Sequence, residues 1–166
     1  MTLEKFNTMH LSDAKDLLMT CCTAKNWVTQ MCSHRPFDSE NDLFKKACNI
    51  WSKMREDDFL EAFEGHPKIG DINSLAKKYR STASMAEHEQ KTVTEASEHT
   101  LSWLTELNDQ YQKKFGFIFI VFASGKSASD MLSLLKSRLG NDRRKELVIA
   151  ASEQQKILQL RLRNLF

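Results

Sequence analysis

The sequence has few helix-breaking residues, with only two prolines and five glycines among 166 residues. It also lacks an excess of charge of one sign, because 24 basic and 22 acidic residues leave a net charge of +2. No basic block with interleaved aromatic residues suggests a nucleic-acid-binding domain. The longest apolar run, Phe117 to Ala123, is far shorter than the roughly 18 residues that a membrane-spanning helix needs. These absences favour a helical globular protein that binds neither nucleic acid nor membrane.

Zinc-site spacing is absent among the four cysteines, which all lie in the first third of the chain. We expect reduced, largely buried thiols instead of disulfides. The histidines form no His-x-x-x-His pattern, so no metal is expected. The N-terminal residues are polar and mixed in charge, without the apolar core of a secretion signal, and the chain does not end in Ser-Lys-Leu. We therefore expect a cytoplasmic protein.

Apolar residues recur at helical spacing through most of the chain. The clearest example is residues 39–54, where Leu43, Ala47, Ile50 and Trp51 form one stripe. Ser39 and Asp42 resemble a capping box before it, and Ser12 is a possible N-cap further upstream. Further helices are expected over residues 11–22, 24–35, 57–65, 84–97, 100–115, 127–139 and 142–166. The sequence therefore predicts one compact, all-α domain of several helices over residues 1–166.

One segment, residues 115–124, contradicts this helical pattern because it is β-branched and aromatic, which favours a strand. No pairing partner is recognisable, and a lone strand leaves its hydrogen bonds unsatisfied. An extended buried segment and a helix start therefore stay open as alternatives. The following Ser-Gly-Lys-Ser resembles the end of a phosphate-binding loop, but Ile120 occupies the position where that motif requires glycine.

A histidine lies in the break "EGHPKIGD", residues 64–71, between two helix-like segments. Because Pro67 follows His66, the histidine backbone is restricted to extended conformations. Gly65 is expected to end the preceding helix with a positive φ, which would leave the ring at a stiff corner. An imidazole with an ordinary pKa of about 6.5 suits proton transfer near neutral pH. His66 is therefore a candidate acid–base residue, and the alternative is a histidine that caps the helix carbonyls.

Two further places carry candidate binding groups. If the chain is helical around Ala86, Glu89 and Gln90, these residues share one face, where a carboxylate and a carboxamide can hydrogen-bond a polar heterocycle. The alternative there is a solvated charged face. In the final helix, Arg161 falls on the side of the apolar stripe and Arg163 on the opposite side. A guanidinium that faces the core needs an anionic partner, which is either an internal carboxylate or a substrate carboxylate.

Five motifs occur in an order that is similar to one enzyme family. They are Arg35–Phe37, His66–Asp71, Glu89–Gln90, Leu104–Ser127 and Lys156–Leu162. Together they resemble the 2-oxo-4-hydroxy-4-carboxy-5-ureidoimidazoline (OHCU) decarboxylases of urate catabolism, and the likeness runs through essentially the whole chain. The resemblance implies an all-α homodimeric enzyme, free of metal and organic cofactor, that converts OHCU to (S)-allantoin.

The resemblance also implies roles for individual residues. His66 would be the catalytic acid–base group, with Glu89 beside it as a second catalytic residue. Arg161, the arginine of the final Leu-Arg-Leu, would bind the substrate, and main-chain groups after Phe-Gly-Phe would hydrogen-bond its ring. The complete set of implied substrate-binding residues is Pro67, Ala86, Gln90, Phe119, Ile120, Val121, Phe122, Ala123 and Arg161.

One departure from the family pattern concerns Ala86, which stands three residues before Glu89 where the family usually has serine. Ser84 keeps the serine-to-glutamate spacing, but His88 then follows where glutamine is required, so we prefer the alignment through Glu89 and Gln90. The missing hydroxyl must then be replaced by another group or by water. This departure leaves two alternatives open: a lyase or hydrolase of a related ureido or imidazoline compound, and a non-catalytic helical binding domain.

Overall fold

The computed structural model describes residues 1–66 and 90–166, and for residues 90–98 it describes the helix without its side chains. Within these residues there are eight helices and no strand, which confirms the predicted all-α class. None of the described helices is both long enough and apolar enough to cross a membrane. The chain divides into two compact units: unit 1 comprises residues 1–66 and 147–166, and unit 2 holds the described residues 90–146. A single domain over residues 1–166 stays a prediction.

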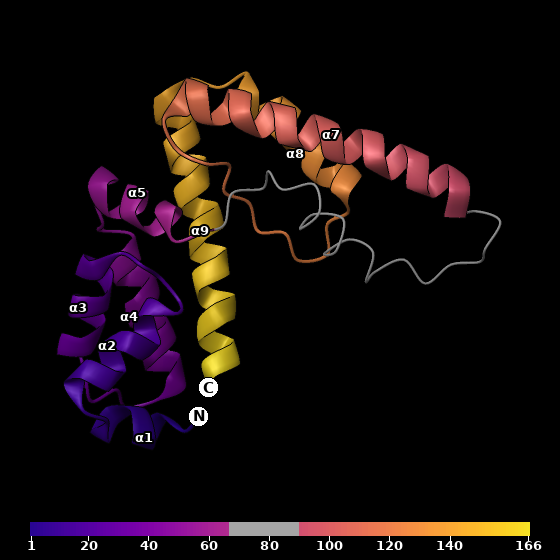
Figure 1. The fold of residues 1–166 in the computed structure, drawn as a ribbon. Coiled ribbons are helices and arrows are strands. Elements are labelled where there is room, and N and C mark those ends of the chain that lie inside the picture. The colour runs from indigo at the N-terminus through magenta and orange to yellow at the C-terminus, as the bar shows by residue number, and fades with distance from the viewer. Residues whose placement is uncertain (67–89) are drawn as a thin grey trace. The chain divides into compact units, whose positions relative to one another are not determined.

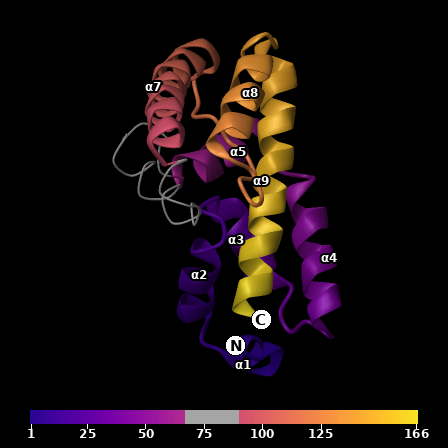
Figure 2. The same ribbon diagram turned by 90° about the vertical axis from the view of Figure 1, so that its right-hand side faces the viewer.

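Unit 1 is built from five short helices and most of a long one (Figure 1). The short helices are α1 (Leu3–Thr8), α2 (Leu11–Met19), α3 (Lys25–Ser33), α4 (Glu40–Trp51) and α5 (Glu56–Glu64). Helix α9 (Arg143–Leu165) begins in unit 2 and continues through unit 1, where α4 runs beside its C-terminal part (Figure 2). The chain ends also meet in unit 1, since the Met1 amino group donates to the Leu165 carbonyl at 2.7 Å.

Side chains at the helix starts explain where α2 and α4 begin. The Ser39 hydroxyl accepts a hydrogen bond from the Asp42 N–H at 3.1 Å, as the capping prediction required. The Asp42 carboxylate does not complete the capping box, because it accepts from the Asp38 N–H at 3.4 Å. The prediction of Ser12 as an N-cap is wrong. The N-cap of α2 is His10, two residues earlier, and its imidazole supplies the capping acceptor through Nδ1.

Two buried tryptophans link the helices of unit 1. The Trp27 indole N–H donates to the Ala47 carbonyl of α4 at 3.2 Å, and the Trp51 indole N–H donates to the Ala151 carbonyl of α9 at 3.0 Å. Because both rings are almost entirely buried, these bonds satisfy a donor that cannot reach water. The predicted stripe of α4 is therefore its core-facing side. Other fully buried large side chains of unit 1 include Phe6, Leu18, Met31, Leu43, Phe63 and Leu158.

Unit 2 contains α7 (Gln90–Phe115) and α8 (Ala128–Leu139), which lie side by side in both views (Figure 1, Figure 2). Helix α8 matches the helix predicted over residues 127–139; the structure adds a complete Ser127–Asp130 capping box before it and Gly140 after it. The prediction of two helices over 84–97 and 100–115 is wrong for the described residues, because α7 runs without a break from Gln90. No glycine or proline interrupts residues 90–115, so propensity permits the longer helix.

The segment between α7 and α8 is neither a helix nor a strand. Its side chains Phe117, Phe119 and Ile120 are buried, so a buried segment outside any sheet, one of the open alternatives, is the correct one. Glycines with positive φ stand at both ends: Gly116 at 81° and Gly125 at 73°. These backbone conformations strain other residues, which explains the glycines of Phe-Gly-Phe and Ser-Gly-Lys-Ser without a bound phosphate.

Candidate functional site

His66 lies directly after α5, where the chain passes close to Thr23. The expected positive φ at Gly65 is wrong, because its φ is −72°. The glycine is needed for space instead, since a Cβ at this position would lie 2.5 Å from Thr23 Cγ2. The Thr23 hydroxyl donates to the Glu61 carbonyl in the last turn of α5 at 2.9 Å. Close packing at the helix end therefore holds the backbone that carries His66.

The His66 ring contacts helix α9 through Gln154. His66 Nε2 lies 2.5 Å from Gln154 Oε1. A carboxamide oxygen only accepts hydrogen bonds, so Nε2 carries the proton and donates it. In the neutral ring, the lone pair is then on Nδ1. Among the described residues the ring bonds Gln154 and not a carbonyl of α5, so the capping alternative does not hold there: the ring is anchored to a helix residue 88 positions away in the chain.

Arg161 is on the same side of α9 as Gln154. Seven residues separate them, which is almost two full helical turns and about 10 Å along the axis. Arg161 is half-buried and Arg163 is exposed, which confirms the predicted difference between the two. The Arg161 guanidinium donates to the Cys21 carbonyl at 3.1 Å. Among the described residues no carboxylate pairs with it, so the internal carboxylate that the sequence offered as one partner is not found there.

The environment of His66 favours the neutral imidazole. Burial lowers its pKa, the positive charge of Arg161 lowers it further, and the hydrogen bond with Gln154 raises it. Burial and the nearby cation both penalise the charged ring, and they outweigh the hydrogen bond. Near neutral pH the ring is therefore uncharged, with one nitrogen that can take a proton. This is the state that a general base requires.

The predicted main-chain binding segment, Phe119 to Ala123, lies in unit 2. The Ile120 carbonyl accepts from Arg138 at 2.7 Å, and the Phe122 carbonyl accepts from Lys126 at 2.7 Å. The Ala123 carbonyl accepts from the Lys126 N–H at 3.2 Å. Within the described part of the chain, the main-chain groups of Phe119 and Val121 make no such bond.

A buried ion pair holds this segment. The side chains of Arg138 and Glu146 are 8% and 0% exposed, and Arg138 Nε donates to Glu146 Oε1 at 2.6 Å. The Tyr111 hydroxyl also donates to Glu146, and the Asn141 amide donates to its second oxygen at 2.7 Å. Burial raises the pKa of Tyr111, and the bond to Glu146 raises it further, so the phenol stays protonated. Every hydrogen-bonding group around the carboxylate is thus a donor.

The side chains of four predicted site residues are not described. Pro67, Ala86 and Glu89 lie outside the described residues, and Gln90 is the first residue of α7, with its side chain undescribed. The predicted roles of these residues stay predictions. In unit 1, the structure brings His66 and Arg161 to the same side of α9.

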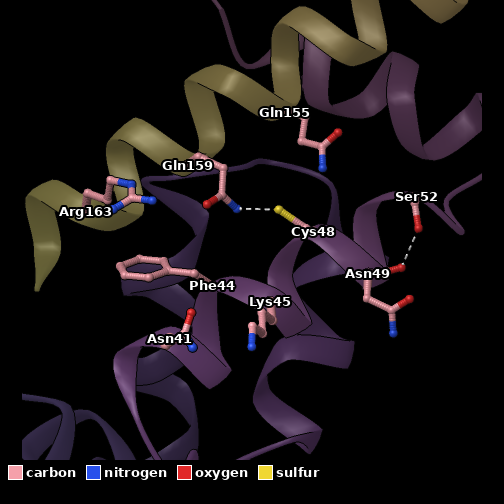
Figure 3. A pocket seen from close by; sticks show the side chains of 9 residues that line it. All are labelled: Asn41, Phe44, Lys45, Cys48, Asn49, Ser52, Gln155, Gln159 and Arg163. Carbon is pink, nitrogen blue, oxygen red and sulfur yellow. Dashed lines mark hydrogen bonds between the residues drawn. The ribbon is translucent and has the colours of Figure 1, made fainter.

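A surface groove on unit 1 lies elsewhere on α9. Its side chains come from α4 and α9, and they include Phe44, Cys48, Gln159 and Arg163 (Figure 3). The Arg163 guanidinium lies over the Phe44 ring at 5.0 Å. At about 100° per residue, the groove side of α9 is well separated from the side of Arg161. None of the predicted site residues lines this groove.

Sequence reasoning missed Gln154 and the Arg138–Glu146 pair. Gln154 was detectable, because it falls about 20° from Arg161 on the same helical wheel and is polar on a mainly apolar side. The ion pair was harder to detect. Arg138 and Glu146 lie in different helices, and nothing in their spacing distinguishes them from charges on a solvated surface.

Residues 7–163 match the family model described as OHCU decarboxylase. The chain therefore belongs to the OHCU decarboxylase family, as the ordered motifs indicated. It is 36% identical over 159 residues to the uric acid degradation bifunctional protein TTL of Arabidopsis thaliana, and it covers 49% of that protein. The aligned region is 95% of this chain, which thus spans about half of that relative's length.

Two further relatives are similar over most of their length. The chain is 31% identical over 143 residues to the 2-oxo-4-hydroxy-4-carboxy-5-ureidoimidazoline decarboxylase of Xenopus laevis, with 81% of this chain and 76% of that protein covered. A crystal structure of OHCU decarboxylase in the presence of (S)-allantoin is 37% identical. It superposes with a TM-score of 0.74 and covers 91% of this chain and 97% of the solved chain.

Proposed function

We propose that the chain catalyses the cofactor-independent decarboxylation of OHCU to (S)-allantoin. Family membership and the relatives named for this activity support the substrate class. The contact between His66 and Gln154, on the side of α9 that carries Arg161, is the observation that carries the proposal. It provides a neutral base and a cation within unit 1, and the substrate is an anion that must lose a hydroxyl proton.

In the proposed reaction, His66 accepts the proton of the C4 hydroxyl. The bond between C4 and the carboxylate breaks, CO₂ leaves, and the electron pair delocalises into the conjugated ring system. A site that stabilises this developing charge and excludes water needs no organic electron acceptor. Two protons then return to the ring, the one held by His66 and one from solvent, and delivery of the carbon-bound proton to one face forms the (S) product.

The state of His66 suits the first of these steps. Because Nε2–H is occupied by Gln154, Nδ1 is the nitrogen that accepts the substrate proton. Arg161 binds an anionic or carbonyl group of the substrate through the N–H groups that the Cys21 carbonyl leaves over. Binding an anion there neutralises the charge that lowers the pKa of His66, so the imidazole becomes a stronger base once the substrate is bound.

The remaining assignments come from the family resemblance. Glu89 is coupled to His66 in proton transfer, and Gln90, Pro67 and Ala86 contact the substrate. The segment Phe119 to Ala123 contributes main-chain hydrogen bonds, for which Phe119 and Val121 have unused groups among the described residues. We also propose a homodimer, which light scattering on the purified chain tests, and a cytoplasmic location.

The experiment compares wild type, His66→Asn and His34→Asn in the decay of freshly generated OHCU. OHCU is made from urate by oxidase and hydrolase, and circular dichroism follows optically active allantoin. His34 is an exposed histidine of unit 1, so its replacement controls for the loss of an imidazole. We expect His66→Asn to lose at least about 100-fold in kcat, since general acid–base groups contribute about 100- to 10,000-fold. Optically active allantoin formed by His66→Asn at the wild-type rate would refute the assignment of His66.

The same assay addresses the alternative functions. If wild type changes neither the decay of OHCU nor the optical activity of the product, the decarboxylase proposal fails and a binding domain is favoured. Arg161→Gln provides a second measure. We expect it to raise KM by about 10-fold or more, because a charge-assisted hydrogen bond contributes about 1.5–3 kcal/mol.

A further inference from the structure

Gln154 is a fully buried polar residue with an unused hydrogen-bond donor. Its side chain is 0% exposed. The oxygen accepts from His66 Nε2, while the amide nitrogen, Nε2, has no hydrogen-bond partner among the described residues. Buried polar atoms are almost always paired, so a buried amide without an acceptor requires an explanation.

Packing alone does not explain a glutamine at this position. The neighbouring core positions on α9 are Ala150, Ala151 and Leu158, all apolar. A methionine has nearly the same length and shape and would fill the same space without an unpaired donor. The side-chain amide also does not link two helices among the described residues, because its one bond there is to the histidine ring. The residue is therefore explained by what it does for His66 and by an acceptor that arrives later.

The geometry supplies both roles. The Gln154 oxygen can only accept, so it fixes the proton on His66 Nε2 and orients the ring. The amide nitrogen is bonded to the same carbon as that oxygen, so its free hydrogens lie within a few ångströms of the imidazole. The hydroxyl that gives its proton to Nδ1 lies at the opposite edge of the ring from Gln154, so the acceptor that the amide lacks among the described residues is a second oxygen atom of the same ligand.

We propose that Gln154 is a bifunctional residue of the site: its oxygen positions His66, and its amide nitrogen donates a hydrogen bond to an oxygen atom of the substrate. This inference rests on the proposed function, because it takes His66 as the proton acceptor. It adds a substrate-contacting residue that lies outside the five ordered motifs, two residues before Lys156–Leu162.

The positioning role is tested first by nuclear magnetic resonance on uniformly ¹⁵N-labelled wild type. We expect an imidazole N–H proton on Nε2 of His66 that exchanges slowly with water, since it is held by a buried acceptor. The spectrum of His66→Asn assigns the signal whether or not that variant is active. Gln154→Met removes the acceptor, so the slow N–H signal should disappear. Gln154→Glu keeps an oxygen acceptor, so the signal should remain.

The donor role is tested by binding of (S)-allantoin, whose carbonyl oxygens stand in for those of the substrate. Both Gln154→Met and Gln154→Glu lack the amide N–H, so both should bind (S)-allantoin about 10-fold more weakly than wild type. Gln154→Met should in addition lower kcat with OHCU, because the histidine is no longer oriented. Gln155→Met is the matched control. Gln155 is the next residue of α9 and lines the surface groove, so none of these quantities should change.

The results separate this inference from the proposed function. Detection of the His66 proton on Nδ1 in wild type would overturn the positioning role. Unchanged (S)-allantoin affinity in the folded Gln154→Met variant would overturn the donor role. By contrast, an active His66→Asn variant defeats the decarboxylase assignment of His66, while the N–H signal and the (S)-allantoin affinities still report on Gln154.

Discussion

Replacing Arg138 by methionine is expected to lower the free energy of unfolding by about 3–5 kcal/mol, although the residue lies outside the proposed reaction. Its guanidinium makes hydrogen bonds to Glu146, to the Ile120 carbonyl and, at 3.3 Å, to the Tyr111 hydroxyl. Removing one member of a buried ion pair costs about 3–5 kcal/mol, because the other charge stays buried without its partner. Asn141 and Tyr111 still donate to Glu146, which places the expected cost towards the lower end of this range.

A double-mutant cycle separates the ion pair from the packing of the methionine. If Arg138→Met is destabilising because it leaves the Glu146 carboxylate buried without a cation, replacing Glu146 by leucine as well should restore a large part of the lost free energy of unfolding. We expect the double variant to lose less free energy of unfolding than the sum of the two single losses, by about 2 kcal/mol or more. Arg144→Met, on an exposed position of α9, should change the stability by no more than about 0.5 kcal/mol.

The assay is urea denaturation followed by helix circular dichroism, with all four variants analysed at one common slope. A loss below about 1 kcal/mol for Arg138→Met, or additive losses in the double variant, would refute the argument. The network also predicts a local effect. The Ile120 carbonyl loses its donor in Arg138→Met, so amide exchange across residues 119–123 should accelerate more than in Arg144→Met.

Three further predictions follow from unit 1. The pKa of His66 is lowered in the folded state, so as pH falls the imidazole of the unfolded chain is protonated first. The free energy of unfolding should therefore fall as pH drops below about 6.5, and His66→Asn should reduce that loss in urea titrations at several pH values. Gly65→Ala should destabilise by about 1–3 kcal/mol in thermal melts, because its Cβ collides with Thr23, and adding Thr23→Ala should recover part of the loss; full stability of Gly65→Ala would contradict the packing argument. Cys48 should react first with a thiol reagent in the native protein, as judged by mass spectrometry, since the other cysteines are buried and burial raises the pKa of Cys22 to about 12.

The helices were predictable because they obey local rules. The α4 stripe and the Ser127–Asp130 box are set by residues three and four apart, and the structure contains both. The wrong predictions concern positions where more than one residue, or more than one physical reason, satisfies the same local rule. An imidazole nitrogen caps α2 as well as a serine oxygen would, so Ser12 was the wrong choice. Gly65 marks a helix end for reasons of space, and the sequence around it carries no sign that Thr23 approaches from 42 residues earlier.

Residues 115–124 show the limit of local propensity. Their composition favours a strand, but a strand needs a neighbour, and the described part of the chain has none. The backbone is stabilised by side chains instead: Arg138 and Lys126 donate to the Ile120 and Phe122 carbonyls. Only the three-dimensional arrangement shows that a buried arginine replaces the missing strand. The alternative of an extended buried segment came from counting unsatisfied hydrogen bonds, not from propensity.

The site in unit 1 follows from the same helical period that builds the core. Leu158 and Leu162 bury one side of α9, and that burial fixes the rotation of the helix about its axis. Once the rotation is fixed, Gln154 and Arg161 must lie on one side of α9, almost two turns apart. Gln154 then contacts His66, and the charge of Arg161 lowers the pKa of His66 in addition to burial. Because apolar packing determines this geometry, the geometry is already present before a ligand binds. The entropic cost of ordering these side chains on binding is therefore smaller. A substitution that rotates α9, such as a charge at Leu158, should therefore disturb His66 and Arg161 together, whereas a substitution in the groove should leave both unchanged.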